Sequence, residues 1–116
     1  MNRSYALLLA LLASTVSVFA QLATNTSIVG RVADSTGASI AEAQITARNQ
    51  DTGEVLTATT NELGNYEFQF LKAGTYSVTV QKTGFSTMSQ KDLALSANQT
   101  VRADFTVQVG SVGAFL

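Results

Sequence analysis

Beyond the N-terminal region, apolar and polar residues alternate with a period of two, and short turn sequences interrupt the alternation at regular intervals. In the clearest case Tyr66, Phe68 and Phe70 share one face, with Glu67 and Gln69 on the other. Successive side chains of a strand point to opposite faces, so this pattern predicts strands that bury one face. No later segment shows an apolar repeat at helical spacing. Closely spaced strands without helices are typical of two packed antiparallel sheets, so we predict an all-β sandwich.

The pattern predicts seven strands separated by turns. Asp34–Gly37 is a typical turn, because Asp caps its own backbone and Gly accepts a positive φ. We expect Ser86–Gln90, which is polar, to be a loop or a weak edge. The expected strands are Ile28–Val32, Ala43–Arg48, Val55–Thr60, Tyr66–Phe70, Tyr76–Val80, Lys91–Leu95 and Thr100–Val109.

The apolar faces of these strands are the expected core. The strand around Tyr66 and the strand around Tyr76 form a predicted hairpin whose aromatic faces pack inward. The last strand contributes a longer apolar face, made of Val101, Ala103, Phe105, Val107 and Val109.

The N-terminus has the pattern of a secretory signal peptide, which is helical when formed. Arg3 gives a short positive region, and Ala6–Ala13 (ALLLALLA) is an apolar run shorter than the ~20 residues that span a bilayer. Val18 and Ala20 occupy the small-residue positions of a cleavage site, so we expect cleavage between Ala20 and Gln21. An uncleaved anchor or a buried helix is the alternative.

The sequence therefore divides into four parts. They are the signal peptide (residues 1–20), a polar lead-in (21–26), the β-sandwich (27–110) and a tail (111–116).

Composition argues against most kinds of chemistry. The 116 residues carry 7 basic and 8 acidic side chains and no His, Cys, Trp or Pro. A net charge of −1 offers no excess of positive charge for nucleic acid. Without His and Cys, the commonest general base and the commonest metal ligands are missing. We expect no enzyme activity, no cofactor and no catalytic, cofactor-binding or metal-binding residue. Asn49–Glu54 is rich in oxygen-bearing side chains, but the residue preferences of a turn explain them without a metal ion.

An ordered set of turn and strand residues carries a resemblance to a known family. The sequence is similar to the carboxypeptidase regulatory-like domain. This resemblance implies a transthyretin-like, Ig-like sandwich of seven antiparallel strands, which is classed with carbohydrate-binding-like folds. The matching segments are Gly30–Asp34, Thr36-Gly37, Ile40–Ile45, Asp51–Gly53, Thr60–Phe68, Leu71–Val78 and Gly84-Phe85.

A closer resemblance includes both ends of the chain. A signal peptide, a polar lead-in, this domain and a last strand ending at Phe105–Gly110 resemble the N-terminal extension of bacterial TonB-dependent outer-membrane receptors. In that family a plug and a barrel follow, whereas this sequence stops six residues after Gly110. The resemblance implies a secreted, non-catalytic interaction or structural module, either stand-alone or part of a truncated receptor. It would be periplasmic or outer-membrane-associated without spanning the membrane, and its partners would be envelope proteins or a missing receptor barrel.

Carbohydrate binding is the main alternative function. Sugar-binding sandwiches usually stack rings on exposed aromatic side chains. Here Phe85 is the single domain aromatic that lacks core-facing parity, and Gly84-Phe85 is expected to plug one end of the sandwich. An intramolecular isopeptide bond is disfavoured, because Arg31 replaces a first-strand Lys and the last strand has no Asn. We expect protein contacts at the sheet edges instead, formed by the Thr-rich third strand and by Ser86–Lys91.

Overall fold

The computed structural model describes residues 25–110, and these residues form eight strands. Within residues 25–110 no helix is found that is long and apolar enough to cross a membrane. The strands are β1 (Ser27–Asp34), β2 (Gln44–Asn49), β3 (Val55–Thr59), β4 (Asn65–Phe68), β5 (Gly74–Gln81), β6 (Met88–Leu95), β7 (Thr100–Arg102) and β8 (Phe105–Val107).

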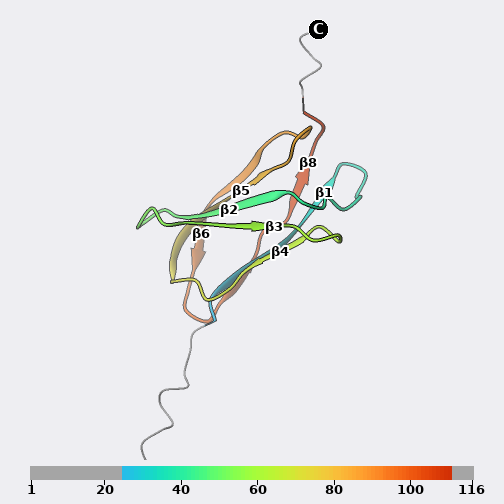
Figure 1. Cartoon of the computed structure of the whole chain (residues 1–116). Helices are drawn as coiled ribbons and strands as arrows, with labels where there is room; N and C mark the ends of the chain where they lie inside the picture. The colour runs from blue at the N-terminus through green and yellow to red at the C-terminus, as the bar shows by residue number, and fades with distance from the viewer. Residues whose placement is uncertain (1–24, 111–116) are drawn as a thin grey trace, which may run out of the picture.

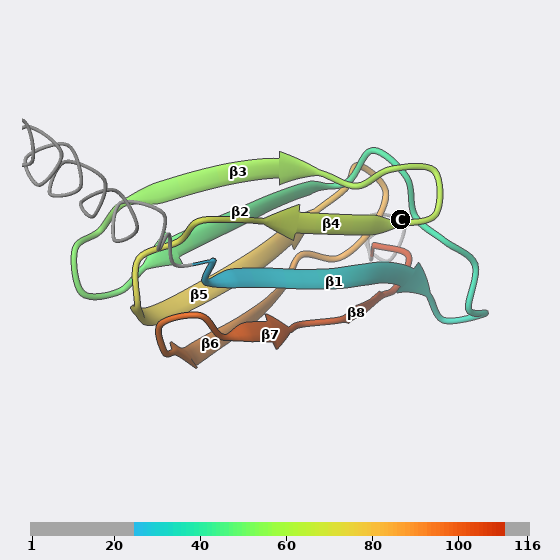
Figure 2. The same ribbon diagram turned by 90° about the horizontal axis from the view of Figure 1, so that it is seen from below.

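The strands form two sheets that pack face to face, which confirms the predicted sandwich (Figure 1). One sheet has the order β4-β1-β7, and β8 also pairs with β1. The other has the order β3-β2-β5-β6. Figure 2 shows β3 and β4 along one side of the sandwich and β6 and β7 along the other.

The last predicted strand is in fact two strands, which corrects the expected count of seven. Between β7 and β8 the N–H of Arg31 donates to the side-chain Oδ1 of Asp104 at 2.8 Å. A side chain thus replaces a backbone carbonyl at this step of the ladder, so the strand pairing is interrupted there.

The expectation of purely antiparallel pairing is wrong at the same place. Both β7 and β8 run parallel to β1. The chain crosses from β6 in one sheet to β7 in the other, and therefore enters the second sheet in the direction of β1. Alternation of side chains does not encode strand direction, which is why the sequence did not reveal it.

The polar stretch before Lys91 belongs to a strand rather than a loop. β6 begins at Met88, and Ser89 pairs with Thr79. Most side chains of this strand are exposed, because the strand lies at the edge of its sheet. The prediction of an edge is confirmed; the prediction of a loop over residues 88–90 is wrong.

The core contains the faces that alternation predicted. The predicted hairpin of the strands around Tyr66 and Tyr76 is wrong, because β4 pairs with β1 in one sheet and β5 pairs with β2 and β6 in the other. The core includes the ring of Tyr76 and the ring pair Tyr66 and Phe68, whose centroids lie 6.0 Å apart in an edge-to-face arrangement. Phe85 is half-buried and packs against this core. The other fully or nearly fully buried apolar residues of the strands are Ile28, Val32, Ile45, Ala47, Val78, Val80, Leu95, Phe105 and Val107.

Two residues assigned to the core are exposed. Phe70 is 68% exposed, because β4 ends at Phe68 and Phe70 has a left-handed backbone (φ 57°) that turns its side chain outward. Leu71 is buried instead. Val109 is 78% exposed beyond the end of β8. Alternation predicts a face only while the backbone stays extended, and at both positions the strand has already ended.

Candidate functional site

The unpaired edges of the sheets are the candidate interaction sites. The sequence analysis expected edges at the Thr-rich strand and at residues 86–91. The structure places β3 and β6 at the two ends of the β3-β2-β5-β6 sheet, which confirms both expected edges. Exposed edges carry unpaired N–H and C=O groups and can accept another strand.

Several features of β6 hinder strand addition. The β5–β6 register shifts between Tyr76 and Val78, and Asp92 has a left-handed backbone (φ 60°). The Gln90 side chain donates to the carbonyl of Asp104 at 2.8 Å, which ties this edge to the other sheet. Bulges and charged side chains are common means of blocking an edge, so β6 is a protected edge.

β3 lacks such protection. Its sequence, VLTAT, contains no charged residue, Gly or Pro, and all five residues pair with β2 without a register shift. Its exposure alternates along the strand, with Leu56 and Ala58 packed against the core. β3 is therefore a regular edge with nothing in its own sequence to deter a partner strand.

The hydrogen bonds at both ends of β3 show which of its residues face the open edge. The N–H of Asn49 donates to the carbonyl of Glu54 at 2.8 Å, and the N–H of Thr60 donates to the carbonyl of Ala43 at 3.0 Å. In an antiparallel ladder, bonded pairs alternate with non-bonded pairs. Residues 56 and 58 therefore bond to β2. Val55, Thr57 and Thr59 direct their backbone groups outward.

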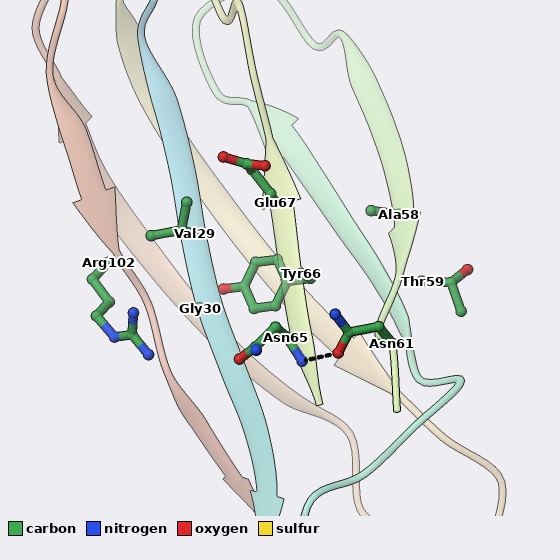
Figure 3. Close-up of a pocket in the computed structure, with 9 residues that line it drawn as sticks. All are labelled: Val29, Gly30, Ala58, Thr59, Asn61, Asn65, Tyr66, Glu67 and Arg102. Carbon is green, nitrogen blue, oxygen red and sulfur yellow. Dashed lines mark hydrogen bonds between the residues drawn. The ribbon is translucent and has the colours of Figure 1, made fainter. Parts of the chain in front are cut away.

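A depression adjoins this edge, between β3 and β4. Its volume is about 390 Å³, and Ala58 and Thr59 line it from the β3 side. Figure 3 shows these residues opposite Asn65 and Tyr66 of β4. Asn61 closes the turn between the two strands by accepting a hydrogen bond from the N–H of Asn65 at 2.9 Å. We refer to this depression as the β3–β4 seam.

Tyr66 packs against β1 and donates a buried hydrogen bond. Its hydroxyl donates to the carbonyl of Ala103, and its ring crosses β1 at Gly30 (Figure 3). A Cβ atom at Gly30 would lie 2.6 Å from the Tyr66 ring and would overlap the Ala103 oxygen. Burial raises the pKa of the Tyr66 phenol above its ordinary value, with a further contribution from Asp104. Tyr66 therefore stays protonated and remains a hydrogen-bond donor.

The carboxylates expected in turns are engaged there. Oδ1 of Asp34 accepts hydrogen bonds from the hydroxyl and N–H of Thr36 and from the N–H of Ala38, at 2.6–3.0 Å. These bonds lower the pKa of Asp34, the Thr36 hydroxyl contributing most. In the oxygen-rich loop, Oδ2 of Asp51 accepts from the N–H of Thr75 at 3.2 Å. Among residues 25–110, no three His, Cys, Asp or Glu side chains gather in a group that could hold a metal ion.

Sequence reasoning identified the edges but not the difference between them. The absence of charged residues in 55–59 is visible in the sequence, whereas the outward-facing backbone groups and the seam depend on the register of the strands.

The expected cleavage site between Ala20 and Gln21, the lead-in up to residue 24 and the tail from residue 111 lie outside the described residues.

Comparisons with known proteins agree with this architecture. The family model for the carboxypeptidase regulatory-like domain matches residues 27–108. No curated protein matches the sequence significantly.

Among solved structures, a candidate carbohydrate-binding protein from Bacteroides uniformis ATCC 8492 is 25% identical with a TM-score of 0.56; the match covers 70% of this chain and 40% of that one. The pilus 2b backbone protein of group B streptococcus is 23% identical, with a TM-score of 0.55 and coverages of 77% and 43%. The 3-chlorocatechol 1,2-dioxygenase of Rhodococcus opacus 1CP is 11% identical, with a TM-score of 0.58 and coverages of 80% and 63%. The chain spans less than two thirds of each of these proteins, and the last two show the fold alone.

Proposed function

The chain belongs to the carboxypeptidase regulatory-like domain family, and from this premise we propose that it is a non-catalytic interaction module of the bacterial envelope. It captures an extended polypeptide segment as an additional strand on β3. The observation that carries this proposal is the regular, uncharged edge of β3, with the outward-facing backbone groups of Val55, Thr57 and Thr59.

Strand addition suits a domain without specialised side chains. The backbone of the incoming segment would supply the affinity through hydrogen bonds to β3. Every second side chain of that segment would face the β3–β4 seam, where Asn61, Asn65 and the edge of the Tyr66 ring offer polar and aromatic contacts. The seam would then select among segments by size and polarity.

The envelope location rests on the sequence of residues 1–20. Their charge, apolar run and small-residue cleavage positions support export. Within the envelope, the resemblance to the N-terminal extension of TonB-dependent receptors supports a periplasmic or outer-membrane-associated role. The captured segment would then belong to an envelope protein or to a receptor barrel.

A proline placed at the open edge tests strand capture. Thr57→Pro removes an outward-facing N–H and leaves the bonds of residues 56 and 58 to β2 in place. A photo-crosslinking residue at Val55 in exported protein should trap a partner, and Thr57→Pro should abolish the adduct while the thermal unfolding transition is retained. Thr57→Val is the matched control, because it keeps the N–H and the β-branched shape.

Thr57→Pro should lose the adduct, and Thr57→Val should keep it. Equal trapping by Thr57→Pro and Thr57→Val would exclude capture through the β3 backbone. A crosslinker at Lys72, in the β4–β5 connection, is the positional control. If it traps as much partner as the crosslinker at Val55, the adduct is not specific for the β3 edge.

Carbohydrate binding is a second candidate, favoured by the relative from Bacteroides uniformis at 25% identity. The structure also supplies an exposed aromatic ring, at Phe70, that the sequence pattern had placed in the core. A glycan array with the full chain tests this function. Binding that Phe70→Ala abolishes would support it, and an array without signal would exclude it for the glycans present.

A further inference from the structure

The outer face of the sheet β3-β2-β5-β6 carries a row of hydroxyl groups. Thr57, Thr46, Thr79 and Ser89 are register neighbours, one on each of the four strands. The hydroxyls of Thr79 and Ser89 lie 3.1 Å apart. This row forms a polar strip that crosses the strands from one edge of the sheet to the other.

Two cations flank a depression on the same face. Arg48 of β2 pairs in register with Ser77 of β5. Both residues line a depression of about 290 Å³ together with Gln50 and Lys91. Within residues 25–110, the one ion pair shorter than 4 Å joins two other residues, Arg102 and Asp104. Arg48 and Lys91 therefore share a depression without a carboxylate partner from the described part of the chain.

The bulge in β6 explains how Lys91 comes to line this depression. The register shifts at this point, so Ser77 lies opposite both Lys91 and Asp92. Gln50 engages Asp92 twice: its Nε2 donates to Oδ1 at 3.2 Å, and its Oε1 accepts from the Asp92 N–H at 2.9 Å. Bulges re-aim side chains beside binding sites. Here the Asp92 carboxylate accepts a hydrogen bond from Gln50, and Lys91 forms no ion pair within residues 25–110.

We propose that this depression binds an oxyanion, a carboxylate or a phosphate, carried by a saccharide. Arg guanidinium groups bind such planar or tetrahedral oxyanions through two parallel hydrogen bonds, and a Lys ammonium adds a second positive charge. The Ser77 hydroxyl is an additional donor. The hydroxyls of Thr46, Thr79 and Ser89 lie next to the depression and contact the neutral part of the saccharide. This site lies on the sheet face and goes beyond strand capture at β3.

Nuclear magnetic resonance titration of the ¹⁵N-labelled full chain tests the site with three probes. Trigalacturonate carries carboxylates, glucose 1-phosphate carries a phosphate, and maltotriose is neutral. We expect the amide signals of Arg48, Ser77 and Lys91 to shift with at least one charged probe and to stay unchanged with maltotriose. The charged probe that binds identifies the source of the oxyanion.

Substitutions assign the binding to these side chains. Arg48→Gln and Lys91→Gln should each weaken binding of the charged probe about tenfold, as the loss of one charge-assisted hydrogen bond does. Lys72→Gln, which removes a lysine that does not line the depression, should leave it unchanged. Strand capture at β3 is measured separately, by cross-linking from Val55, so this site and strand capture succeed or fail separately.

Three results would overturn the proposal. They are the absence of shifts with both charged probes, equal shifts with maltotriose, and unchanged affinity in both Arg48→Gln and Lys91→Gln.

Discussion

Gly30 and Tyr66 show how one missing side chain determines the position of another. Because Gly30 has no Cβ, the Tyr66 ring can lie against β1 and reach the carbonyl of Ala103. The sequence predicts that Tyr66 is buried, from its parity. It does not predict the hydrogen-bond partner, since β1 lies between β4 and Ala103 and that arrangement depends on the order of the strands.

Gly30→Ala should therefore destabilise the domain more than removal of the Tyr66 hydroxyl. The added methyl group meets both the Tyr66 ring and the backbone at Ala103, so we expect a cost of about 3 kcal/mol or more. Tyr66→Phe leaves a buried carbonyl unpaired, which should cost about 1–2 kcal/mol. Urea unfolding of both variants measures the two costs. A Gly30→Ala domain as stable as wild type would show that the close approach is absent.

Asp34 should make stability depend on pH in the acid range. Its pKa in the folded state is lowered, so its contribution to stability is present above the unfolded pKa of about 3.9 and is lost as pH falls through the folded pKa. Asp34→Asn keeps an accepting oxygen but cannot ionise. We expect the stability of wild type to fall more steeply than that of Asp34→Asn between roughly pH 5 and pH 2. Parallel curves in urea melts across this range would contradict the assignment.

At the scale of single elements, β4 shows where prediction from alternation succeeds and where it ends. Tyr66 and Phe68 are buried as predicted, because β4 is extended over Asn65–Phe68. Phe70 follows the same parity but lies outside the strand and is exposed. The faces of β2 and β5 were predictable for the same reason as that of β4. The direction of β7 and β8 was not, since parallel and antiparallel strands alternate alike.

Three substitutions compare how much the buried face of β4, its exposed face and the residue beyond its end contribute to the free energy of unfolding. Phe68→Ala should cost about 3–5 kcal/mol, as large-to-small changes of a core aromatic do. Glu67→Ala, on the exposed face, should cost about 0.5 kcal/mol or less, and Phe70→Ala should resemble it. Urea melts give all three values. A large cost for Phe70→Ala would mean that the Phe70 ring packs against the core in solution.

At the scale of the whole molecule, the fold class and the two edge strands of the β3-β2-β5-β6 sheet were predictable from the sequence, but the distinction between those two edges was not. The sequence predicts an edge at β3 because its polar residues alternate, and at β6 because polar residues cluster there. The register shift at Lys91 and Asp92, which protects β6 and brings Lys91 beside Arg48, depends on pairing with β5. Residues far apart in the sequence form that depression, so no local motif marks it.

Processing of the whole chain is a further prediction. Signal peptidase should cut after Ala20, because Val18 and Ala20 fit the small-residue positions of its site. Mass spectrometry of the exported protein should find a chain that begins at Gln21. A membrane-bound species that retains residues 1–20 would show that the N-terminal segment is an anchor.

The parallel pairing of β1 with β7 and β8 gives the domain a mechanical property. The described chain enters at one end of the sandwich and leaves at the other, as Figure 1 shows. Tension between these ends would pull β1 and β8 along each other, and the hydrogen bonds between them would be loaded in shear and would have to break together. In single-molecule stretching we expect the domain to resist extension until these bonds rupture in one step. A module with this connection would transmit tension between whatever holds Ser27 and whatever follows Val107, without itself unravelling.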